Sequence, residues 1–190
     1  QNAVIARSVF SHLVGSDASQ FDAFTRGQIE MFEAASMQLQ AAFPHKILRH
    51  ICNSAGIERF PGAQFDMVRL GIGLYGISPI DNTNLNNVST LKTTILQIRE
   101  VPEEDTVGYS RKGHLKRDSC IAALPIGYAD GLNRHLGNGH AYCLVNGQRA
   151  PYVGNICMDV CMIDVTDIEC KEGDTVELFG DHLPITVHSD

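Results

Sequence analysis

The sequence lacks several features that would place it in a specialised class of protein. It has no run of 18 apolar residues and no charged-then-apolar leader, so neither a membrane span nor an export signal is predicted. It has no basic excess, since 15 Lys and Arg stand against 22 Asp and Glu, which argues against a nucleic-acid partner. With 190 residues, 44% of them hydrophobic, we expect a globular, cytoplasmic protein.

The six cysteines lack the spacing of a metal site or of a disulfide framework. None forms a C-x-x-C pair, and they are scattered between Cys52 and Cys170. Cys157 and Cys161 lie four residues apart, but in an apolar, alternating stretch with no histidine nearby. We expect buried free thiols and no bound metal ion.

Residues 1–85 alternate strand-like and helical patterns. Residues 4–13 and 47–52 read as short strands, and the segment between them carries apolar residues at helical spacing from Phe21 to Phe43. A further apolar run, residues 66–75, is interrupted by glycines. This rhythm predicts parallel β/α units.

Residues 86–190 have a different pattern, which follows an Asn-rich linker at residues 80–90. Short β-branched or alternating runs are separated here by Gly, Asn and Asp turns; they are residues 91–101, 119–125, 140–145, 148–153, 160–165 and 175–179. There are no internal repeats. We therefore expect an α/β domain at residues 1–85 and a mostly β domain at residues 86–190.

Most of the polar residues that could act on a ligand occur in a few short motifs. These are His50-Ile-Cys-Asn-Ser54, Asp66-Met-Val-Arg69-Leu-Gly71-Ile72, Val107-Gly-Tyr109-Ser, Ile126-Gly-Tyr128-Ala-Asp130-Gly and Ile156-Cys-Met158-Asp159. His12 stands apart from them, at the end of the first strand-like run. Barrel enzymes place functional groups at such strand ends.

Each of these residues also has an ordinary structural interpretation. His12 could be a half-buried histidine with one hydrogen bond, and Asn53-Ser54 could cap a helix. Arg69, embedded in apolar residues, could form a salt bridge with Asp66 or another acid. Tyr109 could be a packing or surface residue.

In order and spacing the motifs resemble those of the alanine racemases, from about residue 4 almost to the C-terminus. The resemblance implies an eightfold β/α barrel that binds pyridoxal phosphate, followed by a mostly β domain, in a homodimer whose active sites are shared head to tail. It implies interconversion of L- and D-alanine for cell-wall peptide synthesis, by two bases on opposite faces of the substrate. Two β/α units cannot close a barrel, so residues 1–85 would be the C-terminal part of one.

The resemblance also assigns roles around the cofactor. Ser54, with Asn53 and the amides of Gly71 and Ile72, would bind the cofactor phosphate. Arg69 would face the pyridine nitrogen, where a cation weakens the ring as an electron sink. Tyr109 would be one of the two bases, delivered to the partner subunit's barrel, and His12 would bridge Tyr109 and Arg69.

Residues of the second domain would contact the substrate. The backbone amide of Met158 would bind the alanine carboxylate, and Asp159 and Tyr128 would narrow the way in. Asp17 and Arg134 would form an outer polar layer. Asn155 stands where some relatives have arginine, so the charge pattern of that approach differs.

The lysine that forms a Schiff base with the cofactor lies near the start of full-length racemases. None of the five lysines here occurs in such a motif, and the chain begins at Gln1. We expect a fragment that lacks this lysine and the last strands, and that is inactive alone.

Other interpretations of the chain stay open. A related pyridoxal-phosphate decarboxylase is one, although its pyridine nitrogen meets a carboxylate rather than an arginine. A non-catalytic dimerisation or regulatory β module of a longer protein is another. Within the racemase interpretation, serine could also be a substrate, because it differs from alanine only by a hydroxyl group.

Overall fold

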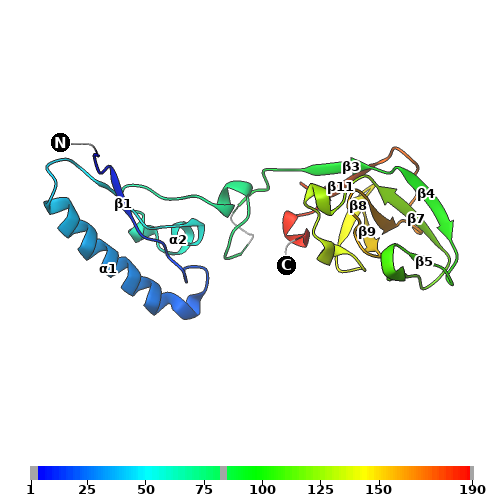
Figure 1. Cartoon of the computed structure of the whole chain (residues 1–190), viewed down its shortest axis with the longest axis horizontal. Helices are drawn as coiled ribbons and strands as arrows, with labels where there is room; N and C mark the ends of the chain where they lie inside the picture. Colours follow the sequence, from blue (N-terminus) through cyan, green and yellow to red (C-terminus); the bar gives the residue numbers. More distant parts are fainter. Residues whose placement is uncertain (1–3, 82–84, 189–190) are drawn as a thin grey trace. The chain divides into compact units, whose positions relative to one another are not determined.

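The computed structural model describes residues 4–81 and 85–188, and the chain divides into two compact units, Gln1–Asn86 and Asn87–Asp190 (Figure 1). Each unit has its own cluster of buried apolar residues. The boundary falls within the Asn-rich stretch, of which residues 82–84 lie outside the described part.

The first unit contains a parallel pair of strands and two helices. Its elements are β1 (Ser8–Phe10), η1 (Ser19–Phe21), α1 (Asp22–Ala41), β2 (Leu48–His50), α2 (Ser54–Arg59), η2 (Pro61–Ala63) and η3 (Ile72–Tyr75), where η marks a 3-10 helix. Phe10 of β1 lies opposite His50 of β2. The predicted parallel β/α order is therefore present, with strands shorter than their apolar runs. Residues 66–75 form no strand, because glycines interrupt the run and it ends in η3.

The core of the first unit lies between α1 and the segments that follow the strands. Phe32 of α1 packs in one cluster with Leu13, Ile51, Cys52, Phe60 and Ala63. Other apolar side chains of the unit remain exposed, among them Phe10 and Met31. The unit therefore buries only part of its apolar surface.

The second unit is built on a seven-stranded antiparallel sheet that curls around its core (Figure 1). In spatial order its strands are β3 (Leu91–Thr94), β11 (Thr175–Phe179), β8 (Tyr142–Val145), β9 (Gln148–Val153), β10 (Cys161–Asp164), β7 (Ser119–Leu124) and β4 (Gln97–Val101). A small antiparallel pair, β5 (Thr106–Val107) and β6 (Gly113–His114), carries Tyr109 in the turn between its strands.

Most strands of the second unit agree with the sequence pattern. β9 and β11 have the predicted bounds, and the run at residues 91–101 forms two strands, because buried Ile95 and the following Leu96 interrupt it. β5 and β6 were not predicted, since two residues are too few to show alternation. The remaining short elements are η4 (Tyr109–Arg111), η5 (Tyr128–Asp130), η6 (Arg134–Leu136) and η7 (Ile185–His188).

Within the described residues, no helix combines the length and the apolar character needed to cross a membrane.

Candidate functional site

A cavity of about 650 Å³ in the first unit brings together six of the predicted site residues. His12, Asn53, Ser54, Arg69, Gly71 and Ile72 all line it, together with Asp17. They come from the segments that follow β1 and β2 and from the run leading into η3. Parallel strands end at one edge of a sheet, which explains how residues far apart in sequence meet here.

Arg69 has no carboxylate partner among the described residues. Its Nη2 donates to the carbonyl oxygen of Ser11 at 2.7 Å and lies 3.2 Å from His12 Nδ1. Its guanidinium also lies over the ring of Phe10. Asp66 instead pairs with Lys46 and Arg49. The alternative structural interpretation of Arg69, a salt bridge with Asp66, is therefore wrong.

His50 is a site residue that the sequence reasoning missed. Its Nδ1 lies 2.7 Å from Arg69 Nη1, its ring stacks on Phe10, and only 6% of the residue is exposed. Burial lowers the pKa of His50 below its ordinary value of 6.5, and the charge of Arg69 lowers it further. The signal was available, because His50 lies in the second half of the strand-like run at residues 47–52, much as His12 lies near the end of the run at residues 4–13.

The arginine fixes the tautomers of both histidines. A guanidinium only donates hydrogen bonds, so the Nδ1 atoms of His12 and His50 must accept, and in each neutral ring the proton is on Nε2. The exposed His12 can therefore donate its Nε2–H to a further group. The Nε2 of His50 is buried and has no partner within the described residues.

Ser54 forms a small polar centre with two backbone amides. Its Oγ accepts from the N–H of Gly71 at 3.0 Å and from that of Gly73 at 3.2 Å. A Cβ on Gly73 would lie 2.9 Å from Leu70 Cδ1 and 3.4 Å from this oxygen, so a larger residue would have to displace the Leu70 side chain. Within the described part of the chain no acceptor takes the Ser54 hydroxyl proton or the N–H of Ile72, which leaves two donors for an anion.

Asn53 caps α2, as the structural interpretation of this residue expected. Its Oδ1 accepts from the N–H of Gly56 and from the hydroxyl of Ser16, both at 2.9 Å. Its Nδ2 donates to the carbonyl of Leu13 at 3.0 Å. The side chain thus ties the segment after β1 to the start of α2, which places Ser54 and keeps the Asn53 amide itself occupied.

The other predicted site residues lie in the second unit. The Tyr109 side chain is exposed, with 72% of the residue accessible, on the turn between β5 and β6. Tyr128 and Met158 are joined through backbone, because Tyr128 N–H donates to the Cys157 carbonyl and Ala129 N–H to that of Met158. Arg134 lies over the Tyr128 ring, and Asp159 is exposed beside Met158. No acceptor among the described residues takes the Met158 N–H.

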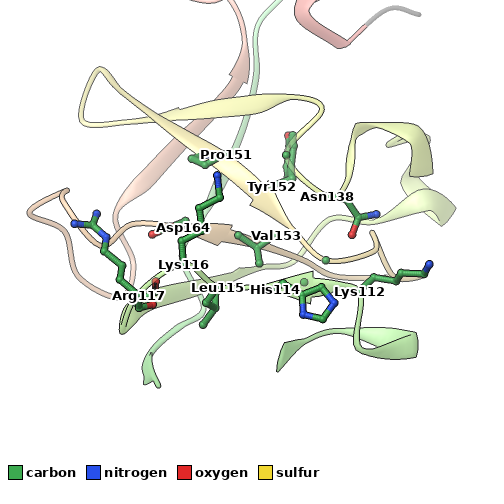
Figure 2. Close-up of a pocket in the computed structure, with 14 residues that line it drawn as sticks. Lys112, His114, Leu115, Lys116, Arg117, Asn138, Pro151, Tyr152, Val153 and Asp164 are labelled. Atoms are coloured by element: carbon green, nitrogen blue, oxygen red, sulfur yellow. Dashed lines mark hydrogen bonds between the residues drawn. The ribbon is translucent and has the colours of Figure 1, made fainter. Parts of the chain in front are cut away.

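A second cavity, of about 630 Å³, lies in the second unit (Figure 2). Its lining includes the basic or titratable residues Lys112, His114, Lys116 and Arg117, together with Pro151, Val153 and Asp164. Arg117 is paired with Asp167, outside the cavity lining. None of the predicted site residues lines this cavity.

Comparison with protein families decides the affiliation of the chain. Residues 1–79 match the model of the alanine racemase N-terminal domain, and residues 88–189 match that of the alanine racemase C-terminal domain.

The chain belongs to the alanine racemase family.

Individual alanine racemases are similar to the chain over most of its length. It is 45% identical over 178 residues to alanine racemase 2 of Caldanaerobacter subterraneus, covering 91% of this chain and 45% of that protein. It is 39% identical over 184 residues to alanine racemase 1 of Clostridium acetobutylicum, covering 94% of this chain and 47% of that protein. The chain thus spans about half the length of these relatives.

Solved alanine racemase structures have the same fold in the matching half. The enzyme of Bartonella henselae, whose structure contains covalently bound pyridoxal phosphate, superposes with a TM-score of 0.81 at 34% identity, over 96% of this chain and 50% of that one. The biosynthetic enzyme of Pseudomonas aeruginosa gives 0.84 at 30% identity, over 100% and 52%.

Proposed function

We propose that this chain is the C-terminal half of a pyridoxal-phosphate-dependent alanine racemase. Residues 1–85 would complete a cofactor-binding β/α barrel, and residues 86–190 would form its β domain. The observation that carries the proposal is the cavity in which Ser54, Arg69, His12, Gly71 and Ile72 meet. Five residues to which the racemase resemblance assigns roles thus line one cavity rather than five separate surfaces.

The donors in this cavity fit the anionic and aromatic parts of pyridoxal phosphate. The Ser54 hydroxyl and the Ile72 N–H are suited to phosphate oxygens, and the absence of side chains at Gly71 and Gly73 lets a phosphate approach the backbone beside them. Arg69 is held by carbonyls and imidazoles, so it stays charged and can lie beside a ring nitrogen. When bound, the cofactor supplies the electron sink that makes the α-proton of alanine acidic enough to move.

Proton transfer requires a base from the second unit. Tyr109 is exposed on a turn, so its phenol is free to enter the barrel of a partner subunit in a head-to-tail homodimer. His12, whose Nδ1 is engaged by Arg69, can donate its Nε2–H to the phenol oxygen, which stabilises the phenolate. The free amide of Met158 would hold the alanine carboxylate, and Tyr128 and Asp159 would limit access.

The isolated chain should not racemise alanine. A second base on the opposite face is needed, and in racemases a lysine that also carries the cofactor supplies it. The lysines of this chain, Lys46, Lys92, Lys112, Lys116 and Lys171, are all absent from the cavity lining. We expect the missing lysine to come from a polypeptide segment outside this chain.

The phosphate part of the proposal can be tested on the chain itself. Titrating pyridoxal phosphate or inorganic phosphate into ¹⁵N-labelled protein should shift the amide signals of Ile72 and its neighbours. In Ser54→Ala the shifts should require roughly tenfold more ligand, because a charge-assisted hydrogen bond is lost. Ser89→Ala, outside the cavity, is the matched control. Equal shifts in wild type and Ser54→Ala would contradict this assignment.

The catalytic part requires a complete barrel. We would fuse the chain behind the N-terminal half of the Caldanaerobacter racemase and follow D-alanine formation and exchange of the α-proton in D₂O. Activity with wild-type sequence, lowered at least about 100-fold in Tyr109→Phe, is expected for loss of a general base. Tyr142→Phe, on β8, should remain active. A fusion that binds pyridoxal phosphate but exchanges no α-proton would contradict the racemase proposal and favour a non-catalytic module.

A further inference from the structure

We propose that Asn155, braced by Asn138, is a positioning residue that holds the turn bearing Tyr109 in its working conformation. This inference rests on the proposed function, in which the Tyr109 phenol transfers the α-proton. It concerns a different question, namely what holds the mostly exposed Tyr109 side chain in its orientation.

The Tyr109 turn has a backbone conformation that ordinary residues rarely adopt. Gly108, Ser110 and Arg111 all have positive φ, at 78°, 59° and 53°. Only the first of these is glycine, so the turn is strained and needs contacts from outside to persist. A Cβ on Gly108 would also meet Met162 Cε at 3.1 Å, so the turn lies close against neighbouring segments.

Asn155 supplies a contact at the centre of the turn. Its Nδ2 donates to the carbonyl of Tyr109 at 3.2 Å, and its Oδ1 accepts from Asn138 Nδ2 at 3.0 Å. Asn138 is itself fixed, because its N–H donates to the Gly154 carbonyl at 2.9 Å. Figure 2 shows Asn138 at the edge of the second cavity, on the loop that precedes β8. Two segments distant in sequence therefore brace the Tyr109 backbone.

The amide chemistry of asparagine suits this place. The position needs a donor for the Tyr109 carbonyl and an acceptor for Asn138 on one short side chain, and a carboxamide has both. Aspartate would have no donor, and arginine would have no acceptor. The pair of asparagines is therefore one solution to the bracing of this turn, and neither can be changed alone without losing a hydrogen bond.

The brace also couples the two groups that would act on alanine. Asn155 lies in the loop between β9 and β10, three residues before Met158, whose N–H has no acceptor within the described part of the chain. The same loop thus carries the proposed carboxylate contact and fixes the proposed base. With the Tyr109 ring mostly exposed, backbone contacts rather than packing set its direction.

The positioning role can be measured on the chain without any activity. Arg111 and Lys112 are exposed trypsin sites within the turn, so local loosening should speed cleavage there. We expect Asn155→Asp and Asn138→Gly to be cut at these sites roughly fivefold faster than wild type, with faster amide exchange at residues 108–112. Glycine at 138 tolerates the φ of 57°, so that variant removes the side chain without adding strain.

Asn146 offers a matched control for both changes. It has a positive φ of 50°, and its Nδ2 donates to the Glu169 carbonyl at 2.9 Å, away from the Tyr109 turn. Asn146→Asp and Asn146→Gly should leave cleavage at Arg111 and Lys112 unchanged. If Asn155→Asp and Asn138→Gly are cleaved at Arg111 and Lys112 as slowly as these controls, the proposed positioning role of Asn155 is overturned, whatever the chain catalyses.

The racemase fusion supplies the functional arm. Asn155→Asp should lower kcat about tenfold to a hundredfold while KM for alanine changes little, because misplacing the base affects the transition state more than binding. When Asn155→Asp is added to Tyr109→Phe, kcat should be almost the same as in Tyr109→Phe alone. A loosened turn with unchanged kcat would overturn the catalytic importance of the brace. Absence of activity in the wild-type fusion would instead refute the proposed function. The trypsin cleavage rates would then still show whether Asn155 and Asn138 hold the Tyr109 turn.

Discussion

Arg69 determines the hydrogen-bonding pattern of the first cavity because it can only donate. Its bonds to His12 and His50 place both ring protons on Nε2, one exposed and one buried. A permanent cation held by neutral acceptors keeps its charge available to a ligand, whereas a salt bridge to a carboxylate would neutralise it. The residue-level chemistry of the site thus depends on Asp66 being engaged elsewhere.

His50 predicts a loss of stability in mild acid. Its pKa is lowered from 6.5 by burial and by Arg69, so between the folded pKa and 6.5 the unfolded chain binds a proton that the folded chain does not. Stability is complete above 6.5 and falls as the pH drops toward the folded pKa. Urea denaturation, monitored by amide exchange, should show the first unit weakening as the pH falls below about 6.5.

The control is His188, whose pKa burial also lowers, but which lies in the second unit. His50→Gln should flatten the pH dependence of the first unit only, and His188→Gln that of the second unit only. An unchanged slope in the first unit of His50→Gln would show that another group causes the effect.

At this scale the sequence names residues most readily where the residue type limits the options. His12, Ser54 and Arg69 were assigned roles together from the sequence, and the structure places all three on one cavity, while the roles themselves stay predictions. His50 and Asn155 were harder to assign, since a strand-end histidine or a loop asparagine has many ordinary roles. Their significance comes from partners that are distant in sequence, Arg69 and Tyr109.

At the scale of elements, Gly127 shows how close backbone contact builds the second unit's site. Its φ is −149°, so conformational freedom is not what requires glycine here. A Cβ would instead lie 2.3 Å from the Met158 carbonyl oxygen and 2.4 Å from that of Cys157. These carbonyls accept the backbone bonds that join Tyr128 and Ala129 to the Met158 loop.

Gly127→Ala should therefore lower the free energy of unfolding of the second unit by about 1–3 kcal/mol, the usual range for overpacking. Gly27→Ala in α1 is the opposite case, since nothing lies within 4 Å of its added Cβ. It should stabilise the first unit by about 0.5–1 kcal/mol, because alanine is the better helix former. Chemical denaturation measures both, and a Gly127→Ala protein as stable as wild type would refute the close contact.

Elements were predictable where the periodicity extends over several residues. α1 shows helical spacing, and β9 and β11 show runs bounded by turns, so their positions follow from the sequence. Two features could not be predicted, namely the division of residues 91–101 into β3 and β4 and the short β5–β6 pair. Both depend on tertiary packing, which a local sequence pattern does not show.

For the whole molecule, the two units differ in how much core they possess. Among the residues that the structure describes, seventeen buried residues form the cluster of the second unit, whereas six form that of the first. The first unit also exposes Phe10, Phe24 and Met31, apolar side chains that further strands and helices would cover in a complete barrel. Stability scales with buried apolar area, so the second unit should be the more stable of the two.

Calorimetry of the chain should accordingly show two transitions, with the first unit melting at the lower temperature. Residues 87–190 prepared alone should reproduce the upper transition, and Gly27→Ala should raise only the lower one. A single transition with equal calorimetric and van't Hoff enthalpies would contradict this independence. If the exposed apolar surface is the contact face for the rest of a barrel, adding the N-terminal half of the Caldanaerobacter racemase should raise the lower transition alone, because a partner stabilises only the state that it binds.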